Sequence, residues 1–269
     1  AMGERVGENT ILVAGAKGGV GTSTVALNLS VQIAQLTKKR VALLDYARPF
    51  GQISVVLDFQ PRFTLMDALD RIERLDGPLL ASLTTKHKSG VEILPGAMHT
   101  ALTAAQRQHV TLESLARIVA LADSVFDTVV VDVGFVNAAE WSLVLQQARN
   151  ILLVTEPSML ALVMLDRYMQ AAKLAGIEGE RFEIILNRWR QNDDEMLAQF
   201  EKEKGHTIKT RLPNDYRQLT EAVKLAMPLT GSSSNALVAR YRDLARQMAN
   251  APAEMAHRGA NAMAGVPAK

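Results

Sequence analysis

A short segment near the amino terminus combines the residue types that bind phosphate groups. It follows an apolar run, reads Lys-Gly-Gly-Val-Gly-Thr-Ser-Thr and leads into a segment of helical period. Glycines allow successive amide N–H groups to converge on phosphate oxygens, and the start of a helix adds the positive end of its dipole. A glycine-rich turn alone is often only a tight connection, but a lysine, three glycines and a serine at these spacings predict phosphate binding. The candidate residues are Lys17, Gly18, Gly19, Val20, Gly21, Thr22, Ser23 and Thr24.

Two aspartates come directly after apolar, strand-like runs. Asp132 follows three valines, and Asp45 follows two leucines. Because a charged side chain at the end of a buried strand has few structural uses, Asp132 favours a functional role. Asp45 is open to two interpretations, since an acid at the carboxyl end of a strand is as often a helix cap or an ion-pair partner. Ser23 lies where P-loop proteins place the hydroxyl that binds Mg²⁺.

Short β-branched runs alternate with longer segments in which apolar residues recur every three or four positions. The runs predict strands and the longer segments predict helices. This alternation is typical of an α/β fold with a doubly wound, mostly parallel sheet, and we expect seven or eight strands with helices on both faces. The expected strands are 11–16, 40–46, 90–95, 128–133, 150–155, 183–187 and 207–212, and the expected helices include 24–36, 112–122, 138–148, 159–175 and 215–226.

The composition is that of an ordinary globular chain. Of 269 residues, 48% are hydrophobic and 22% are charged, and Lys plus Arg exceed Asp plus Glu by 30 to 28. The small net charge gives no large attraction to nucleic acid or anionic lipid, so nucleic acid is an unlikely partner. The absence of cysteine excludes disulfides and cysteine metal sites and fits a cytoplasmic location. The apolar runs are far shorter than the roughly twenty residues of a membrane-spanning helix, which predicts no direct membrane insertion.

The chain is expected to form one nucleotide-binding domain over residues 11–250. Residues 1–10 are interpreted as a leader and have no secretory signal pattern. Residues 251–269 are rich in Ala, Pro and Gly, a composition that predicts a disordered tail.

The segment from Lys17 to Thr24 resembles the deviant Walker A motif of the MinD/ParA superfamily of P-loop ATPases. The resemblance extends over roughly residues 9–249 and implies a protein that binds ATP or ADP with Mg²⁺. It also implies a homodimer in which Lys17, the signature lysine, reaches the phosphates of the partner in a nucleotide sandwich. Two departures stand out: Ala16 replaces the first Walker glycine, and Thr22 occupies the position of the second lysine.

Other motifs complete the resemblance. Asp132 resembles the Walker B aspartate, and Asp45 matches an aspartate that holds a water of the Mg²⁺ shell, which makes Lys17, Asp45 and Asp132 the candidate catalytic residues. Ser23, Asp45 and Asp132 are the candidate metal site. The aspartate that would orient the attacking water is Ala47 here, so weak or absent ATP hydrolysis is expected.

Two further motifs resemble the segments that contact the nucleotide base in this superfamily. Asn187 and Arg188 end a predicted strand and look like the Asn-Arg pair that contacts adenine. Pro213 and Asp215 lie in a segment that resembles the loop closing over the base. Taken as bare motifs, the two are also compatible with a strand end and a turn.

The Gly-Thr-Ser-Thr ending and the Thr-Glu-Pro at Glu156 resemble the CpaE/TadZ branch, whose members assemble Flp/Tad (type IVb) pili. The resemblance therefore implies pilus and secretion machinery proteins as partners, and recruitment through them to the inner membrane or the cell pole. It assigns no role to Glu156. Two alternatives remain open: a pseudo-ATPase scaffold that does not depend on nucleotide, and a ParA-like DNA partition ATPase.

Overall fold

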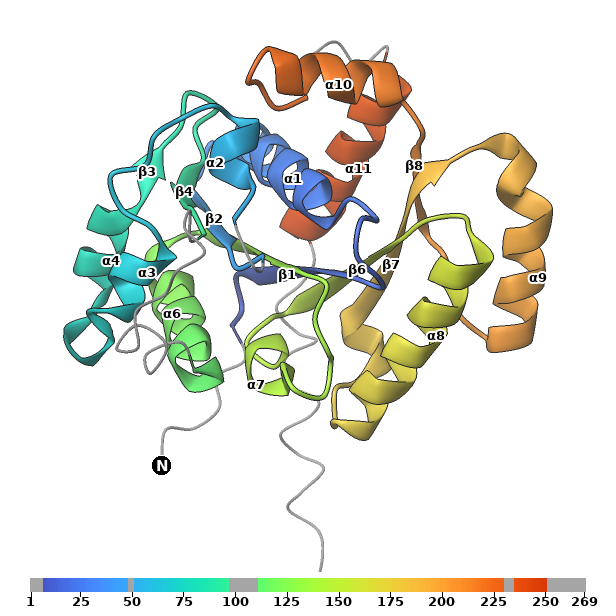
Figure 1. Ribbon diagram of the computed structural model, residues 1–269, viewed down its shortest axis with the longest axis horizontal. Coiled ribbons are helices and arrows are strands. Elements are labelled where there is room, and N and C mark those ends of the chain that lie inside the picture. Colours follow the sequence, from blue (N-terminus) through green and yellow to red (C-terminus); the bar gives the residue numbers. More distant parts are fainter. Residues whose placement is uncertain (1–6, 48–50, 97–110, 230–234, 251–269) are drawn as a thin grey trace, which may run out of the picture.

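The computed structural model describes residues 7–47, 51–96, 111–229 and 235–250. Eight strands in these residues form one sheet in the order β3-β4-β2-β5-β1-β6-β7-β8 (Figure 1). Every neighbouring pair is parallel except β3 and β4. The strands are β1 Thr10–Gly15, β2 Val41–Asp45, β3 Thr85–Lys86, β4 Glu92–Leu94, β5 Thr128–Gly134, β6 Asn150–Thr155, β7 Phe182–Trp189 and β8 Thr210–Pro213.

Helices cover both faces of the sheet, as Figure 1 shows. On one face α1 packs against α11, and on the other lie α6, α7 and α8. The helices are α1 Thr22–Thr37, α2 Ile53–Val56, α3 Leu65–Leu69, α4 Gly77–Leu83, α6 Leu112–Val125, α7 Ser142–Leu145, α8 Met159–Leu174, α9 Asp194–Lys204, α10 Tyr216–Lys224 and α11 Ala236–Asn250, with 3-10 turns η1 Ile72–Arg74, η2 Gly179–Arg181 and η3 Gln191–Asp193.

The central strands are buried on both faces because each face has its own apolar layer. Along β1, Leu12 and Ala14 pack with the α6 to α8 layer, whereas Ile11 and Val13 pack with the α1 and α11 layer. Successive side chains of a strand point to opposite faces, so a strand between two layers must be apolar throughout. The buried runs seen in the sequence therefore mark the middle of the sheet.

The expected α/β fold and strand count are confirmed. The structure adds β3, a two-residue edge strand, and shortens the helix expected over 138–148 to α7. The preceding residues form a turn instead, in which the side-chain oxygen of Asn137 accepts hydrogen bonds from the amides of Ala139 and Glu140. The predicted tail and residues 1–6 of the leader lie outside the described residues. Within those residues, no helix is both long and apolar enough to cross a membrane.

Candidate functional site

The candidate site lies at the carboxyl ends of the central strands, where β1 has β5 on one side and β6 on the other. The helix that follows β1 covers one face of the sheet, and the helix that follows β6 covers the opposite face. Neighbouring strands whose connections leave in opposite directions open a crevice between them. The phosphate loop follows β1. The two aspartates and the predicted base-contacting residues lie in or directly after the carboxyl-terminal parts of β2, β5, β7 and β8, at the same edge of the sheet.

The phosphate loop is held open between β1 and α1. The Ala16 amide donates to the Val154 carbonyl of β6 at 2.8 Å, which fixes the start of the loop. Gly19 and Gly21 have φ angles of 82° and 95°, in the region that favours glycine. The first turn of α1 contains no acidic residue, and no side-chain hydrogen bond caps it. Its amide groups and positive dipole end are therefore available to an anion.

Asn187 secures this loop from the neighbouring strand β7. Its Nδ2 donates to the Val20 carbonyl at 2.8 Å, and its Oδ1 accepts from the Arg188 amide at 3.0 Å. A Cβ atom at Gly21 would approach Asn187 Nδ2 to 2.4 Å, so glycine is also required there for packing. The side-chain amide of Asn187 thus contacts the phosphate loop itself, and its contact with adenine stays a prediction.

Thr22 is buried and packs against the end of β1. Its side chain is 7% exposed, and its Oγ1 would lie 2.6 Å from a Cβ atom at Gly15. Gly15 is therefore a second packing glycine of the loop, one that the phosphate-binding pattern does not single out. The structure places Thr22 in the loop as predicted but gives its hydroxyl a packing position.

Asp45 and Asp132 are brought together by strand register, because they are paired positions of the parallel strands β2 and β5. Asp132 is fully buried; its Oδ1 accepts from the Gly134 amide at 3.0 Å, whereas Oδ2 has no hydrogen-bond partner among the described residues. Burial and then the neighbouring Asp45 carboxylate raise the pKa of Asp132 to about 7, against the effect of Ser23 and the Gly134 amide. An unpartnered buried carboxylate oxygen is ready for a cation or a donor.

Asp45 uses its two oxygens to accept backbone amides from Ala47 and from the start of α2. Oδ1 accepts from the Ala47 amide at 3.2 Å and Oδ2 from the Ile53 amide at 3.1 Å. Burial raises the pKa of Asp45, although these two amides and those of Gln52 and Gly96 oppose the shift. The structural interpretation of Asp45 as a cap therefore has direct support in the hydrogen bonds.

Asp45 is also enclosed by two glycines from different loops. A Cβ atom at Gly51 would lie 2.6 Å from both Asp45 Oδ2 and the Gly96 Cα. A Cβ atom at Gly96 would lie 2.7 Å from the Gly51 Cα. Only glycine lets these two backbones meet over the carboxylate, a requirement that the sequence pattern alone does not reveal.

Lys17 and Arg188 converge on Glu156, which follows β6. Lys17 Nζ lies 2.8 Å from Glu156 Oε1, and Arg188 Nη1 lies 2.6 Å from Glu156 Oε2. Partial burial opposes ionisation of Glu156, but the two cations outweigh it and lower the pKa of this carboxyl. The sequence marks Glu156 as part of a motif, and the structure shows which residues it holds.

The segment that follows β8 lies beside the end of β7. The Asn214 amide donates to the Trp189 carbonyl at 2.9 Å, and Pro213 pairs in register with Trp189. Asp215 caps α10 by accepting from the Gln218 amide at 3.0 Å. The predicted base-contacting residues are therefore brought to one edge of the site, with Asp215 acting as a helix cap.

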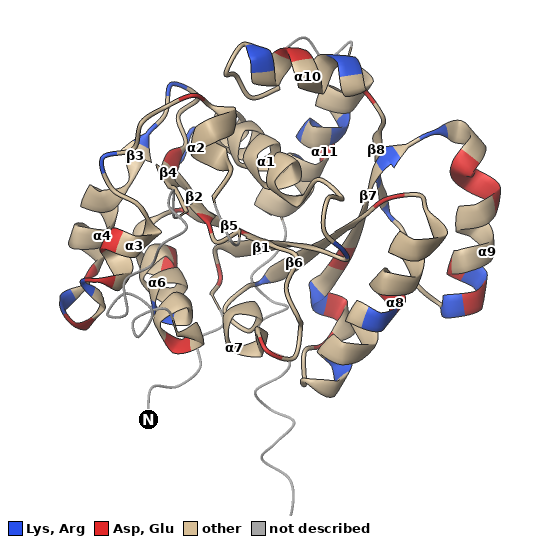
Figure 2. Cartoon of the chain, viewed as in Figure 1, with Lys and Arg blue, Asp and Glu red and all other residues tan. Residues whose placement is uncertain are grey.

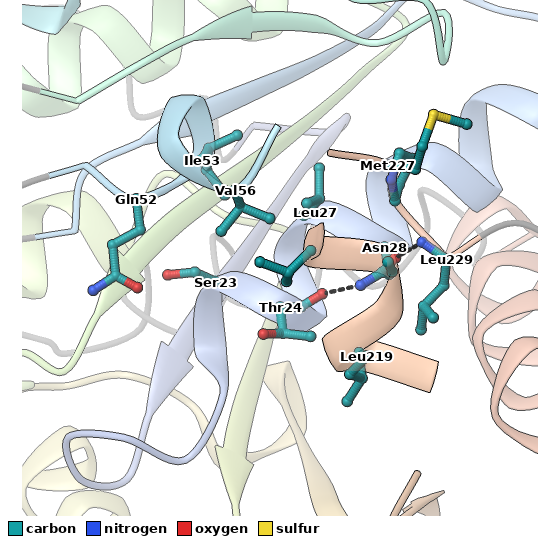
Figure 3. Close-up of a pocket in the computed structure, with 13 residues that line it drawn as sticks. Ser23, Thr24, Leu27, Asn28, Gln52, Ile53, Val56, Leu219, Met227 and Leu229 are labelled. Carbon is teal, nitrogen blue, oxygen red and sulfur yellow. Dashed lines mark hydrogen bonds between the residues drawn. The ribbon is translucent and has the colours of Figure 1, made fainter. Parts of the chain in front are cut away.

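A cavity of about 90 Å³ lies between α1, α2 and α10. Figure 3 shows Ser23 and Gln52 at one end, and Met227 and Leu229 at the other. Leu219, from α10, lines its apolar wall. Ser23 therefore lines the same cavity as Gln52 and Ile53.

The oxygen donors fit Mg²⁺ of the nucleotide-bound type. Such sites use one or two carboxylates together with waters and phosphate oxygens, not a cage made of protein alone. Within the described part of the chain, no group of three or more His, Cys, Asp and Glu residues could hold a metal ion. The Ser23 hydroxyl and the unpartnered Asp132 Oδ2 supply oxygen donors of the required kind.

The parallel sheet, the glycine loop and the open start of α1 define a P-loop fold. Comparison with known proteins agrees: residues 7–52 match a family model described as NUBPL iron-transfer P-loop NTPase, of the ParA type. The septum site-determining protein MinD of Thermotoga maritima is 24% identical over 252 residues, 89% of this chain and 88% of the relative. The antiactivator FleN of Pseudomonas aeruginosa is 37% identical over 100 residues, 37% of this chain and 33% of FleN.

A MinD-type relative from Oltmannsiellopsis viridis is 28% identical over 219 residues, 77% of this chain, and the chain spans 64% of its length. Among solved structures, the ParA family ATPase from Chlorobium tepidum has a TM-score of 0.76 at 25% identity, covering 89% of this chain and 99% of that one. MinD of Pyrococcus horikoshii complexed with Mg-ADP has a TM-score of 0.72 at 21% identity, covering 93% and 99%. In fold and in its glycine loop, the chain is thus similar to P-loop NTPases of the MinD/ParA type.

Proposed function

We propose that this protein binds an adenine nucleotide with Mg²⁺ at the phosphate loop. The observation that most directly supports this proposal is the open first turn of α1, which has neither an acidic residue nor a capping side chain. Anion binding at such a helix start needs only amide groups and the helix dipole. The related MinD complexed with Mg-ADP supports the same ligand here.

Different residues of the site would bind the phosphates, the Mg²⁺ ion and the base. The amides from Gly18 to Thr24 would hold the phosphates, and Asn187 keeps the loop in shape through the Val20 carbonyl. Ser23 and Asp132 would hold Mg²⁺, which when bound neutralises phosphate charge. Asp45 would reach the ion through a water, as the resemblance implies, while its two oxygens each also accept a backbone amide. Arg188 and Pro213 lie where the base would pack.

Hydrolysis is proposed to be weak or absent. Thr22 cannot supply the cationic charge that a Walker lysine places on the phosphates, and its side chain is buried against Gly15. Ala47, which lies opposite Gly134 at the end of β5, has no carboxylate to align water. These substitutions are also what favours the alternative function, a scaffold that uses the fold without depending on nucleotide.

We propose that ATP binding brings two copies together through the phosphate-loop face, with Lys17 directed at the partner's phosphates. The proposal rests on the position of Lys17 at the start of the loop and on its resemblance to the signature lysine. Lys17→Ala should weaken ATP-dependent self-association, which analytical ultracentrifugation measures. An unchanged monomer-dimer balance would remove the sandwich.

The cellular role that we propose is positioning or assembly of a Flp/Tad-type pilus secretion machine, with recruitment to its cytoplasmic side. Support comes from sequence motifs, the Gly-Thr-Ser-Thr ending of the loop and the Thr-Glu-Pro around Glu156. A solved MinC:MinD cell division complex from Aquifex aeolicus shows that a protein of similar fold can assemble with a protein partner. Lost pilus assembly or lost focal localisation on deletion would support the role, and normal pili would contradict it.

A DNA partition role has less support from the charges. Figure 2 shows Lys and Arg interspersed with Asp and Glu on α9 and α10. Arg188, the first residue of a basic Arg-Trp-Arg segment, is engaged by Glu156. Duplex DNA binding that appears with ATP and falls steeply with salt would favour this role over the pilus role.

The experiment that tests nucleotide binding is calorimetric titration of the full chain with ATP in the presence of Mg²⁺. Saturable binding that weakens when Mg²⁺ is chelated is the expected result. Binding of neither ATP nor ADP would overturn the proposal and leave the scaffold alternative. Phosphate release at saturating Mg-ATP then separates a binder from an enzyme.

A further inference from the structure

Three neighbouring strand ends bring Lys17, Glu156 and Arg188 into one charged cluster. The sheet order places β6 between β1 and β7, so Glu156 stands between the phosphate loop and the start of the predicted base site. The hydrogen bond from the Ala16 amide to the Val154 carbonyl keeps the loop and the end of β6 at fixed spacing. Glu156 and Lys17 are only 17% and 23% exposed, so this pair is more protected than an ordinary surface ion pair.

Glu156 holds Lys17 inside its own subunit. The Lys17 ammonium contacts Glu156 Oε1 and the Gly18 carbonyl, both of the same chain. In that position the ammonium is paired within its own chain. The second oxygen of Glu156 engages Arg188, whose backbone φ of 59° lies in the left-handed region. One carboxylate therefore restrains a residue on each side of it.

We propose that Glu156 is a latch that keeps Lys17 in the monomer and must release it before two copies close over nucleotide. The inference rests on the proposed sandwich dimer and assigns to Glu156 the control of that step. Releasing the latch exchanges one anion for another, because the carboxylate is replaced by phosphate oxygens as the partner of the ammonium. Nucleotide bound in a second copy thus competes with Glu156 for the same lysine.

The size of the effect follows from the strength of ion pairs at partly exposed positions. Removing one such partner changes an equilibrium by about two- to fivefold. Glu156→Gln keeps the shape of the side chain and removes its charge. The matched control is Glu92→Gln, since Glu92 pairs with Arg40 at 2.9 Å, is 15% exposed and lies at the start of β4, at the opposite end of the strands.

The first measurement probes the latch without nucleotide. Acylation of Lys17 by an N-hydroxysuccinimide ester, followed by peptide mass spectrometry, reports how accessible its amine is. We expect Glu156→Gln to speed modification of Lys17 by about two- to fivefold and Glu92→Gln to leave it unchanged. Equal rates in all three proteins would overturn the latch, whatever the protein does with ATP.

The second measurement follows self-association by analytical ultracentrifugation with Mg-ATP. Glu156→Gln should tighten the dimer by a similar factor, and the gain should vanish in the double variant Lys17→Ala with Glu156→Gln. A gain that persists without Lys17 would show a general charge effect and overturn the latch. If the wild type binds no ATP and no variant self-associates, the proposed sandwich fails, and the acylation rates still report separately on the Lys17–Glu156 contact.

Discussion

Asp45, the last residue of β2, is paired in register with Asp132 of β5, yet the two carboxylates have different hydrogen-bond partners. Asp45 accepts a backbone amide on each oxygen, from Ala47 and from Ile53. Asp132 leaves Oδ2 buried without a partner among the described residues. Two aspartates of the same candidate metal site therefore differ in role: one organises the backbone, and the other is free to meet a cation.

This difference predicts opposite effects of the same substitution. Asp45→Asn should lower the free energy of unfolding by about 1–3 kcal/mol, because an amide nitrogen would face one of the two backbone N–H groups. Asp132→Asn should leave the nucleotide-free protein at least as stable and abolish the Mg²⁺-dependent part of ATP affinity. Urea denaturation and calorimetry with and without Mg²⁺ measure the two effects. Equal loss of stability in both variants would contradict the assignment.

The pKa of Asp132, raised to about 7 by burial and by Asp45, predicts how stability depends on pH. An aspartate in the unfolded chain has a pKa of about 3.9, so the folded state binds the proton more tightly. The resulting stabilisation is full below about pH 4 and is lost as the pH rises through about 7, on the order of 1 kcal/mol per pH unit at the steepest. Urea denaturation of nucleotide-free protein between pH 5 and pH 8 should show this decline.

The control for the pH experiment is Asp132→Asn, which removes the titrating carboxyl and should flatten the decline. Saturating Mg-ATP should also flatten it, because a nearby cation favours the ionised carboxylate. A wild-type profile that rises over this range and is unchanged in the variant would show that other groups dominate.

Gly15 and Gly18 form a matched pair for testing the packing of the phosphate loop. Gly15→Ala should destabilise the protein by about 1–3 kcal/mol, because its Cβ would lie 2.6 Å from Thr22 Oγ1 and 3.0 Å from the Lys17 carbonyl oxygen. A Cβ at Gly18 meets no atom within 4 Å, so Gly18→Ala should leave stability unchanged. Thermal unfolding measures both, and equal melting temperatures would contradict the inward packing of Thr22.

The parts of the fold that sequence could predict are those fixed by local pattern. The strand expected over 150–155 matches β6, because its run of β-branched and aliphatic residues is buried on both faces. The edge strand β3 has one half-buried and one exposed residue and contains no apolar run. It forms by pairing with β4, so the sequence has no local pattern that predicts it. The helix expected over 138–148 failed for a similar reason, since the Asn137 side chain favours a turn ahead of α7.

In the candidate site too, the features that are contiguous in sequence could be predicted, and the long-range contacts could not. Glycine spacing predicts where the phosphate loop lies, because the loop is contiguous in sequence. The contact of Glu156 with Lys17 joins residues 139 positions apart in numbering, and sheet order alone brings them together. Whether Asp45 acts as a cap or as a neighbour of the metal likewise depends on its contact with the Ile53 amide, which no rule of residue spacing predicts.

The remaining prediction concerns the rate of ATP hydrolysis, which the substitutions at Thr22 and Ala47 should keep low. Loss of one well-placed donor to the transition state costs roughly 3 kcal/mol, about a hundredfold in rate. The losses need not multiply, because residues that act together are not additive. Wild-type turnover should therefore lie far below that of a typical enzyme.

The double variant Thr22→Lys with Ala47→Asp should raise hydrolysis at least about tenfold, measured as phosphate release at saturating Mg-ATP. Because the Thr22 side chain is buried against Gly15, we expect the longer lysine side chain to leave this space and to place its charge at the phosphate loop. Ala16, which is buried at the start of the loop, is unchanged in both proteins and serves as a constant background. A brisk wild-type rate would refute the interpretation of Thr22 and Ala47. A flat response despite intact ATP binding would place the defect elsewhere in the loop.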